Sequence, residues 1–338
     1  MTDRERHPED VTLTVSPASR EHPQASRVAL PGEPAELEMT AEAAYESGLE
    51  MEARSHWAYA RKRFLRHRLA MGSLVFLVII LTAGFMSSSI APYEFDAIDL
   101  DNLAAGPTTT DNHFFGTDQL GRDYFSRVLY GIETSARVAF IVALLSTIIG
   151  TVIGAVAGYF GGWIDNLLMR VTDLFLTLPT LAVLLVASAY LGRGSPTRVA
   201  VILALLFWTT LARIVRGTFL SLREKEYVEA AKAAGGSDFR IMLRHILPNS
   251  MGPIIVNATL TVAAAILVEA ALSFLGFGVQ PPTPALGKLI SDGQSEMLTA
   301  WWLVTFPGLV IVVIVLCVNF IGDGLRDALD PTQRRIRA

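Results

Sequence analysis

Residues 222–249 read LREKEYVEAAKAAGGSDFRIMLRHILPN. The first half of this stretch consists of strong helix formers and ends at Gly235-Gly236, a pair that favours a turn. Ser237 can cap a second helix, which we expect to end where Pro248 intervenes. The stretch therefore predicts a hairpin of two short helices (residues 224–248). Their apolar faces would be formed by Tyr227, Ala230, Ala231 and Ala234 in the first helix, and by Phe239, Met242, Leu243 and Ile246 in the second.

Long apolar stretches lie on both sides of this hairpin. The chain is 51% hydrophobic and only 18% charged, with a mean hydropathy of +0.42, which is too apolar for an ordinary soluble domain. A helix needs about 20 residues to cross a bilayer. Pro179 interrupts one of the candidate spans, but proline is tolerated in such helices when neighbours satisfy the freed carbonyl. The sequence therefore predicts an all-α membrane protein with six transmembrane helices, at 70–90, 137–159, 172–191, 199–215, 253–277 and 301–321.

Basic residues indicate the orientation of these spans, because positive charge is retained on the cytoplasmic side of a membrane. Beyond the first 52 residues, 18 lysines and arginines gather at one set of span ends and six at the other. We therefore expect both termini to be cytoplasmic. The same orientation gives an outer loop at 91–136, a shorter outer segment at 278–300 and a cytoplasmic loop at 216–250, which contains the hairpin.

The first 52 residues differ from the rest of the chain. They hold 12 acidic and four basic residues and are rich in Pro, Glu, Ser and Ala, a composition typical of disorder. We expect a disordered, acidic cytoplasmic tail at 1–52, and a tail with a function of its own is the alternative. The first apolar run starts late and is longer than the core of a signal peptide, so we expect no cleavage.

Residues 53–68 carry Trp57, Ala60 and Phe64 at helical spacing beside three arginines. This pattern is typical of an amphipathic helix that lies flat in the lipid headgroup layer. An early start of the first span is the alternative, which the arginines disfavour. We expect residues 69–338 to form one six-helix domain. Within it, a repeat of glycine at every fourth position would let another helix approach closely, at Gly150, Gly154 and Gly158.

Three polar residues stand out near or within the expected spans: Glu269, Asn257 and Asp173. An ionised carboxylate in a span is costly unless it is paired or hydrated, so we expect Glu269 to face the protein interior. There it would bond to neighbouring helices, with direct contact to cargo as the alternative. A self-sufficient ion-coupled carrier would need more buried carboxylates than these.

Motifs for catalysis and for metal binding are absent from the sequence. The only Gly-Lys pair, Gly287-Lys288, lacks the flanking residues of a P-loop, and the six histidines show no close ligand spacing. Cys317 is the only cysteine, so a single chain can form neither a disulfide framework nor a thiolate metal site. We therefore expect no catalytic residue, no bound cofactor, no metal and no nucleic-acid partner.

The hairpin resembles the cytoplasmic loop of permease subunits of ATP-binding-cassette (ABC) importers. That loop carries Glu-Ala-Ala, a glycine four residues later, and then Ile-x-Leu-Pro. The isoleucine falls one residue late in this chain, at Ile246, with His245 in its usual place. The resemblance implies that the loop couples to an ATPase. The residues assigned to this coupling surface are Tyr227, Glu229, Ala230, Ala231, Gly235, Gly236, Ile246, Leu247 and Pro248.

Three further stretches resemble the dipeptide and oligopeptide branch of that family. They are FGTDQLGRDYFSR at 115–127, EAALSFLGFG at 269–278 with two prolines soon after it, and GDGLRDALDP at 322–331. The chain departs from the branch at Glu133, where Arg is usual, and at Ala285-Leu286, where Ser-Trp is usual. The long polar approach to the first span is more similar to the oligopeptide than to the dipeptide subunit.

The resemblance implies a type I ABC importer permease fold in a bacterial inner membrane and a function in peptide import. The chain would pair with a second, similar permease and with two ABC ATPase subunits that use ATP and Mg. An extracytoplasmic binding protein would deliver the peptide, and this chain, surrounded by lipid, would form half of the pathway and hydrolyse nothing. Alternatives are a permease of the same type for nickel, glutathione or another small solute, and a self-sufficient carrier or membrane enzyme.

Overall fold

Helices dominate the structure, because an apolar segment in lipid has to satisfy its backbone hydrogen bonds internally. The structure is a computed structural model that describes residues 56–191 and 195–329, all within the compact unit Arg54–Ala338. In these ranges β-structure is limited to isolated bridges, two of them between residues of 98–123 and a further one at Val279. The tail expected at 1–52, the first residues of the helix expected at 53–68 and the C-terminal residues 330–338 lie outside the described residues.

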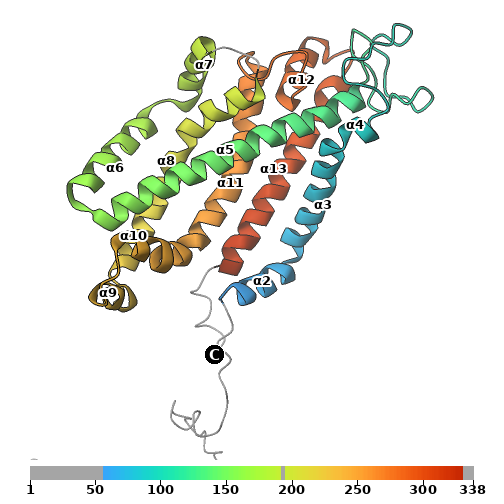
Figure 1. Ribbon diagram of the computed structural model, residues 1–338. Coiled ribbons are helices and arrows are strands. Elements are labelled where there is room, and N and C mark those ends of the chain that lie inside the picture. The colour runs from blue at the N-terminus through green and yellow to red at the C-terminus, as the bar shows by residue number, and fades with distance from the viewer. Residues whose placement is uncertain (1–55, 192–194, 330–338) are drawn as a thin grey trace, which may run out of the picture. The chain divides into compact units, whose positions relative to one another are not determined.

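Within the described ranges, five helices are long and apolar enough to cross a membrane. Helix α11 packs against α5 and α13, α3 packs against α13, and α5 packs along α8 (Figure 1). Each of these helices contains most of one expected span. They are α3 (Arg68–Phe85), α5 (Tyr124–Phe160), α8 (Pro196–Arg223), α11 (Leu247–Phe274) and α13 (Trp302–Leu329).

The remaining expected span, 172–191, is a bent pair of helices. Helix α6 (Gly162–Thr177) and helix α7 (Thr180–Leu191) meet at an angle of 88°. A proline disfavours the helical conformation of the residue before it, and Leu178, which precedes Pro179, is extended with ψ at 134°. If the pair is one crossing, the described chain has the six spans predicted. The predicted start at residue 172 was wrong, because polar residues inside α6 break its apolar pattern.

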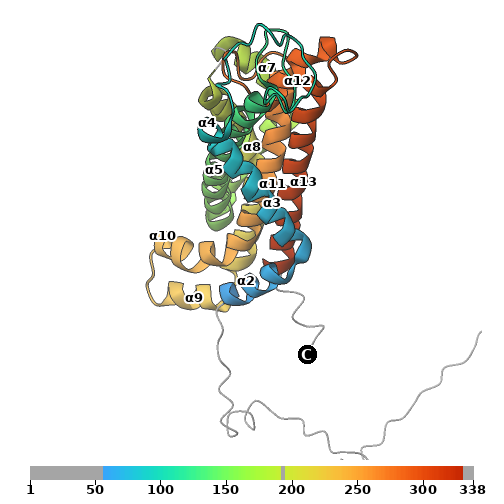
Figure 2. The same cartoon turned by 90° about the vertical axis from the view of Figure 1, so that its right-hand side faces the viewer.

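Short helices lie at both ends of the bundle (Figure 1, Figure 2). A π-helix, η1 (Met242–Ile246), leads into α11, and a short 3₁₀-helix, η2 (Gln294–Glu296), follows α12. We call the two ends the α9 end and the α12 end. The α9 end holds α2 (His56–Arg66), α9 (Glu226–Ala233) and α10 (Asp238–Ile241), and the α12 end holds α4 (Ser87–Ile90), α7 and α12 (Leu286–Gly293). Helix α2 lies where we predicted the interfacial helix, and its depth in lipid stays a prediction.

Helix α5 begins well before the second span was expected. Its first residue is Tyr124, so the predicted boundary at residue 136–137 was wrong for the helix, and the irregular loop runs only over 91–123. The cause is a side-chain cap: Asp123 Oδ2 accepts a hydrogen bond from the backbone N–H of Ser126 at 2.7 Å. Tyr124 and Val128 are then buried, and this anchors the first turns of the helix.

The glycine repeat of α5 lets another helix approach closely, as predicted, and the structure shows that this helix is α8. A Cβ atom added at Gly150, Gly154 or Gly158 would lie 2.7, 2.4 or 2.6 Å from a backbone carbonyl oxygen of α8. Such distances leave no room for a side chain, so the two helices are in backbone contact along three successive turns. This contact fixes α8, whose last turn leads directly into the hairpin.

Candidate functional site

The hairpin has the tight turn that its sequence predicts. The backbone N–H of Gly236 donates to the carbonyl of Ala231 at 3.0 Å, and Gly235 adopts a left-handed conformation with φ at +78°. This conformation favours glycine, because side chains in it are strained. Ser237 occupies the N-cap position of α10 as expected, although its side chain makes no capping hydrogen bond.

The second arm of the hairpin does not end at Pro248, which corrects our prediction. Helix α10, the π-helix η1 and helix α11 form one continuous helix from Asp238 to Phe274. The N–H of Leu247 bonds to the carbonyl of Met242, five residues back, and this wider turn makes room for the proline ring. The second arm of the hairpin and the fifth span are therefore parts of the same helix, so a displacement of the hairpin also displaces the span.

Three apolar side chains of the hairpin anchor it to the bundle. Val228, Ile241 and Ile246 are fully buried, and they belong to one cluster with Tyr159, at the end of α5, and Phe219 of α8. The sequence predicted only Ile246 among the three. Val228 and Ile241 fall outside the faces assigned from helical spacing.

The opposite side of the hairpin is exposed and partly apolar. Phe239 is 72% exposed, Leu243 47% and Tyr227 42%. Of the residues assigned to the coupling surface, Ile246 is buried, whereas Ala231, Gly236 and Leu247 are half-buried. Those exposed are Tyr227, Glu229, Ala230, Gly235 and Pro248. We call Tyr227, Ala230, Phe239 and Leu243 the exposed hairpin surface.

Polar contacts tie the hairpin to the end of α5. The hydroxyl of Tyr159 donates to Asp238 Oδ1 at 2.6 Å, and the Lys232 ammonium lies 5.6 Å from the centroid of the Tyr159 ring. Arg223 Nη1 donates to the carbonyls of Gly158 and Tyr159 at 3.2 and 3.3 Å. The sequence analysis did not predict these contacts. Any displacement of the hairpin is thereby shared by α5 and α11.

Two ion pairs hold α6 against α8. Arg216 binds Asp165 through two parallel bonds of 2.5 and 2.6 Å, and Arg213 Nη2 lies 2.5 Å from Asp173 Oδ1. A bidentate arginine–carboxylate pair has well-defined geometry and restricts both side chains. Asp173, singled out from the sequence, is thus a partly exposed member of an ion pair, while Asp165 was not predicted.

Glu269 is completely buried, as predicted, and it lies at the junction of three segments. Ser135 of α5 donates its hydroxyl to Glu269 Oε2 at 2.9 Å, and Ser273 of α11 donates to Oε1 at 2.6 Å. The two serine oxygens in turn accept the backbone N–H groups of Leu286 and Val279 at 3.3 and 3.2 Å. The carboxylate therefore organises the chain that follows α11. Asn257, the other polar residue predicted on α11, is half-buried.

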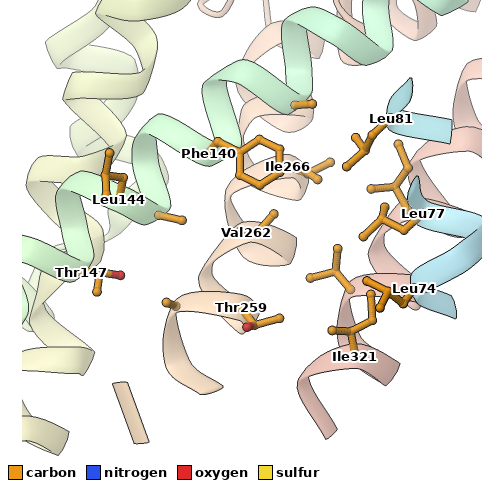
Figure 3. A pocket seen from close by; sticks show the side chains of 15 residues that line it. Leu74, Leu77, Leu81, Phe140, Leu144, Thr147, Thr259, Val262, Ile266 and Ile321 are labelled. Atoms are coloured by element: carbon orange, nitrogen blue, oxygen red, sulfur yellow. The ribbon is translucent and has the colours of Figure 1, made fainter. Parts of the chain in front are cut away.

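An apolar cavity of about 420 Å³ opens between α3, α5, α11 and α13. In Figure 3, Leu77 and Leu81 of α3 point toward Phe140 of α5 and Ile266 of α11. None of the side chains that the structure places in this wall is charged, and its only hydroxyls belong to two threonines. Such a surface cannot by itself bind the charged ends of a peptide, because a buried charge needs a polar partner.

A buried histidine organises the irregular loop at the α12 end. His113 Nδ1 lies 2.9 Å from Asp123 Oδ1, His113 Nε2 lies 3.4 Å from Asp99 Oδ2, and Tyr93 stacks on the imidazole at 4.9 Å. Burial opposes the imidazolium, but the hydrogen bonds to the two carboxylates outweigh it and raise the pKa of His113. In the part of the chain that the structure covers, no three acidic, histidine or cysteine side chains are arranged to hold a metal ion.

The comparisons with known proteins agree with this arrangement. The family described as the binding-protein-dependent transport system inner membrane component matches residues 150–335, and the N-terminal transmembrane domain of oligopeptide transport permease C matches residues 55–107. This chain belongs to that family of ABC importer permeases. As a permease of this family, it is a multi-pass protein of the inner membrane whose transporter contains further subunits.

Curated relatives of this permease align with more than four fifths of the chain. The oligopeptide transport system permease protein OppC of Escherichia coli K12 is 43% identical over 286 residues, 85% of this chain and 94% of that protein. OppC of Mycobacterium tuberculosis H37Rv is 41% identical over 277 residues, 82% of this chain and 94% of that one. The glutathione transport system permease protein GsiD of Shigella flexneri serotype 5b is 41% identical over 281 residues, 83% and 92% of the two chains.

Proposed function

We propose that this chain is the transmembrane permease subunit of an ATP-driven, binding-protein-dependent importer of peptides. It forms half of the translocation pathway beside a second homologous permease. Two ABC ATPase subunits bind at the α9 end and use ATP and Mg²⁺, and an extracytoplasmic binding protein delivers peptide at the α12 end. The permease itself catalyses no reaction and binds no cofactor. The observation that carries this proposal is the exposed hairpin surface on a helix continuous with a span.

A surface of this kind suits a machine in which ATP is hydrolysed elsewhere. Exposed apolar side chains usually mark a contact, and Phe239 and Leu243 lie outside the buried cluster that anchors the hairpin. A partner that pushes on them moves α11 directly and moves α5 through Tyr159 and Asp238. Because α5 and α11 both reach the α12 end, closure of the ATPases at one end can open the pathway at the other.

The orientation belongs to the same proposal. The α9 end faces the cytoplasm, in agreement with the excess of lysine and arginine beside the spans at that end. Cysteines introduced at Thr109, Ser295 and Ser237, all exposed, test this directly. An impermeant thiol reagent added to intact cells should label the first two and leave the third unlabelled. Labelling at Ser237 alone would reverse the orientation.

Peptide cargo is supported by the names of the relatives that are 41% and 43% identical, both oligopeptide permeases. Glutathione is the second candidate, because a glutathione permease is 41% identical over a similar length. Both are short chains with free charged ends, so a common mechanism serves either.

Uptake by cells distinguishes the cargoes. A strain lacking this gene, and complemented with it or with an empty vector, is supplied with labelled dipeptides, tripeptides, longer peptides and glutathione. We expect complementation to restore uptake of peptides of three or more residues, and only when the cognate binding protein is present. Restoration of glutathione uptake alone would replace peptide by glutathione in the proposal. No dependence on the binding protein would refute the importer itself.

A further inference from the structure

A second cavity, at the α12 end, has a wall unlike that of the apolar cavity. It has a volume of about 280 Å³ and lies between the start of α5, the loop before it, and α12 with η2. Its position separates it from the hairpin by the whole length of the bundle (Figure 1). Its wall contains five charged side chains: Asp118, Arg122, Arg127, Asp292 and Glu296.

Three of these charges are neutralised inside the protein. Asp118 Oδ2 accepts hydrogen bonds from Arg122 Nε and lies 2.7 Å from Arg122 Nη2, while Asp118 Oδ1 accepts two backbone N–H groups. Asp292 is paired with Lys288, one turn earlier on α12. These pairs occupy the acceptor positions of Asp118, neutralise the charge of Arg122, and give Asp292 a cation of its own.

Arg127 is the cation that remains. Its side chain is only 5% exposed, and Nη1 donates to the carbonyl of Phe95 at 3.2 Å. Nε is buried and has no hydrogen-bond acceptor among the residues that the structure describes, and Asp118 Oδ2 lies 4.0 Å from it. An unsatisfied donor on a buried charged group is costly, more so than on a neutral one. Arg127 thus lines the cavity with a guanidinium group whose hydrogen bonds are incompletely satisfied.

Glu296 is the anion that remains. It is half-buried, and one of its oxygens accepts a hydrogen bond from Thr299 Oγ1 at 3.3 Å. No lysine, arginine or histidine of the described chain forms an ion pair with it. Among the described residues, the cavity therefore offers one positive group that shares its only paired carboxylate, Asp118, with Arg122, and one negative group without an ion pair.

We propose that this cavity binds a small zwitterion, with its carboxylate on Arg127 and its ammonium near Glu296. A free amino acid or a dipeptide has this chemistry. The volume supports a ligand of that size, because pockets for drug-sized molecules span about 300–1,000 Å³. The choice of ligand class rests on the proposed function, since a peptide importer meets such molecules at this end. The existence of the site rests only on the charged side chains of Arg127 and Glu296 in the cavity wall.

Binding to the purified complex tests the site without transport. The complete transporter in lipid nanodiscs, without ATP and without binding protein, is titrated calorimetrically with Ala-Ala, with its C-terminal amide and with its N-acetyl derivative. We expect the wild-type complex to bind Ala-Ala about 10-fold or more tightly than either derivative, because a charge-assisted hydrogen bond contributes more than a neutral one. The amide lacks the carboxylate and the N-acetyl form lacks the ammonium, so each derivative removes one contact.

Variants assign each contact to its residue. Arg127→Gln should lose the preference for Ala-Ala over the amide, and Glu296→Gln should lose the preference over the N-acetyl form. Arg137→Gln is the control, because this arginine lies farther along α5, is 63% exposed and pairs with Glu133 outside the cavity. It should bind all three probes as the wild type does. If Arg127→Gln fails to assemble, Glu296→Gln, at a half-buried position, still decides the ammonium contact.

Two outcomes would overturn the site. One is equal binding of Ala-Ala and both derivatives by the wild-type complex, which would mean that water alone satisfies Arg127. The other is a charge preference that survives in both variants, which would place the binding elsewhere in the complex. Either result leaves peptide uptake by cells unaffected, so failure of this site and failure of the importer proposal are distinguishable.

Discussion

At the scale of single residues, Glu269 is a buried carboxylate that binds the hydroxyl groups of two neighbouring serines. Its two oxygens accept the hydroxyls of Ser135 and Ser273, and all three side chains are buried. Glu269→Gln keeps an oxygen for one serine and offers an amide to the other. Glu269→Ala leaves both hydroxyls unpaired at about 1–3 kcal/mol each. We expect the alanine variant to lower the melting temperature and yield of the complex far more than the glutamine variant.

Uptake measured beside stability separates a structural from a transport role. If the glutamine variant is stable but transports nothing, the carboxylate acts on cargo and not only on its neighbours. Wild-type stability and uptake in both variants would show that neither role holds.

The environment of a single residue could be predicted from the sequence where its residue type allows only one physical arrangement. A carboxylate inside an apolar span has to face the interior, and a Gly-Gly pair after a run of helix formers predicts a turn; the structure confirms both. The contact of Tyr159 with Asp238 could not be predicted, because 79 residues separate them and neither has an unusual neighbourhood in sequence. The roles of the predicted coupling residues stay predictions.

At the scale of elements, the contact between α5 and α8 gives a sharp test. A methyl group at Gly154 would lie 2.4 Å from the carbonyl oxygen of Ala212, so Gly154→Ala has to push the helices apart. Overpacking of this kind costs about 1–3 kcal/mol. We expect a lower melting temperature of the purified complex and weaker coupling of ATP hydrolysis to uptake.

Gly217→Ala is the matched control on α8. No atom lies within 4 Å of a Cβ placed at Gly217, so the same change should be neutral or slightly stabilising. Equal melting temperatures for the two alanine variants would contradict the close contact of α5 and α8.

The loop at 91–123 should depend on pH through His113. Its pKa is raised in the folded protein, so its contribution to stability is complete below the unfolded value of about 6.5 and is lost as the pH rises through the folded value. The groups that face it are Asp123, Asp99 and Tyr93. The pKa of Asp99 is lowered by its hydrogen bonds, so this carboxylate stays ionised throughout that window.

We therefore expect the melting temperature of the complex to fall between pH 6 and pH 9 more in the wild type than in His113→Gln. Other titrating groups contribute equally to both proteins, so the difference between the two slopes isolates His113. Parallel slopes would show that folding does not raise the pKa of His113.

Helix boundaries could be predicted where the polarity of the sequence changes abruptly. They could not be predicted where a capping hydrogen bond or a π-helix determines where a helix begins or ends. The apolar runs located α3, α8 and α13, whereas the start of α5 depends on the cap by Asp123, and the passage through Pro248 depends on one wide turn. The composition of a stretch averages over many residues and so predicts where a span lies. It does not predict where the helix begins, because a single capping hydrogen bond can extend a helix by three turns. The bend between α6 and α7 was signalled only by Pro179.

At the scale of the whole molecule, the central claim is that the exposed hairpin surface receives the ATPase subunits and passes their motion to α5 and α11. Ala230 is the best position to test it, because it is exposed, whereas the neighbouring Ala231 packs partly against the buried cluster. A carboxylate at Ala230 changes the docking surface without entering the core. Thr109→Glu adds the same charge at an exposed position of the α12 end and serves as control.

The decisive measurement is the amount of ATPase subunit that copurifies with Ala230→Glu, together with ATP hydrolysis stimulated by the binding protein. The account predicts a complex that reaches the membrane in normal amount, retains less than about a tenth of its ATPase and shows no stimulation, since an unpaired charge in an apolar interface costs several kcal/mol. Thr109→Glu should retain both. Full retention of the ATPase with normal stimulation in Ala230→Glu would contradict the account.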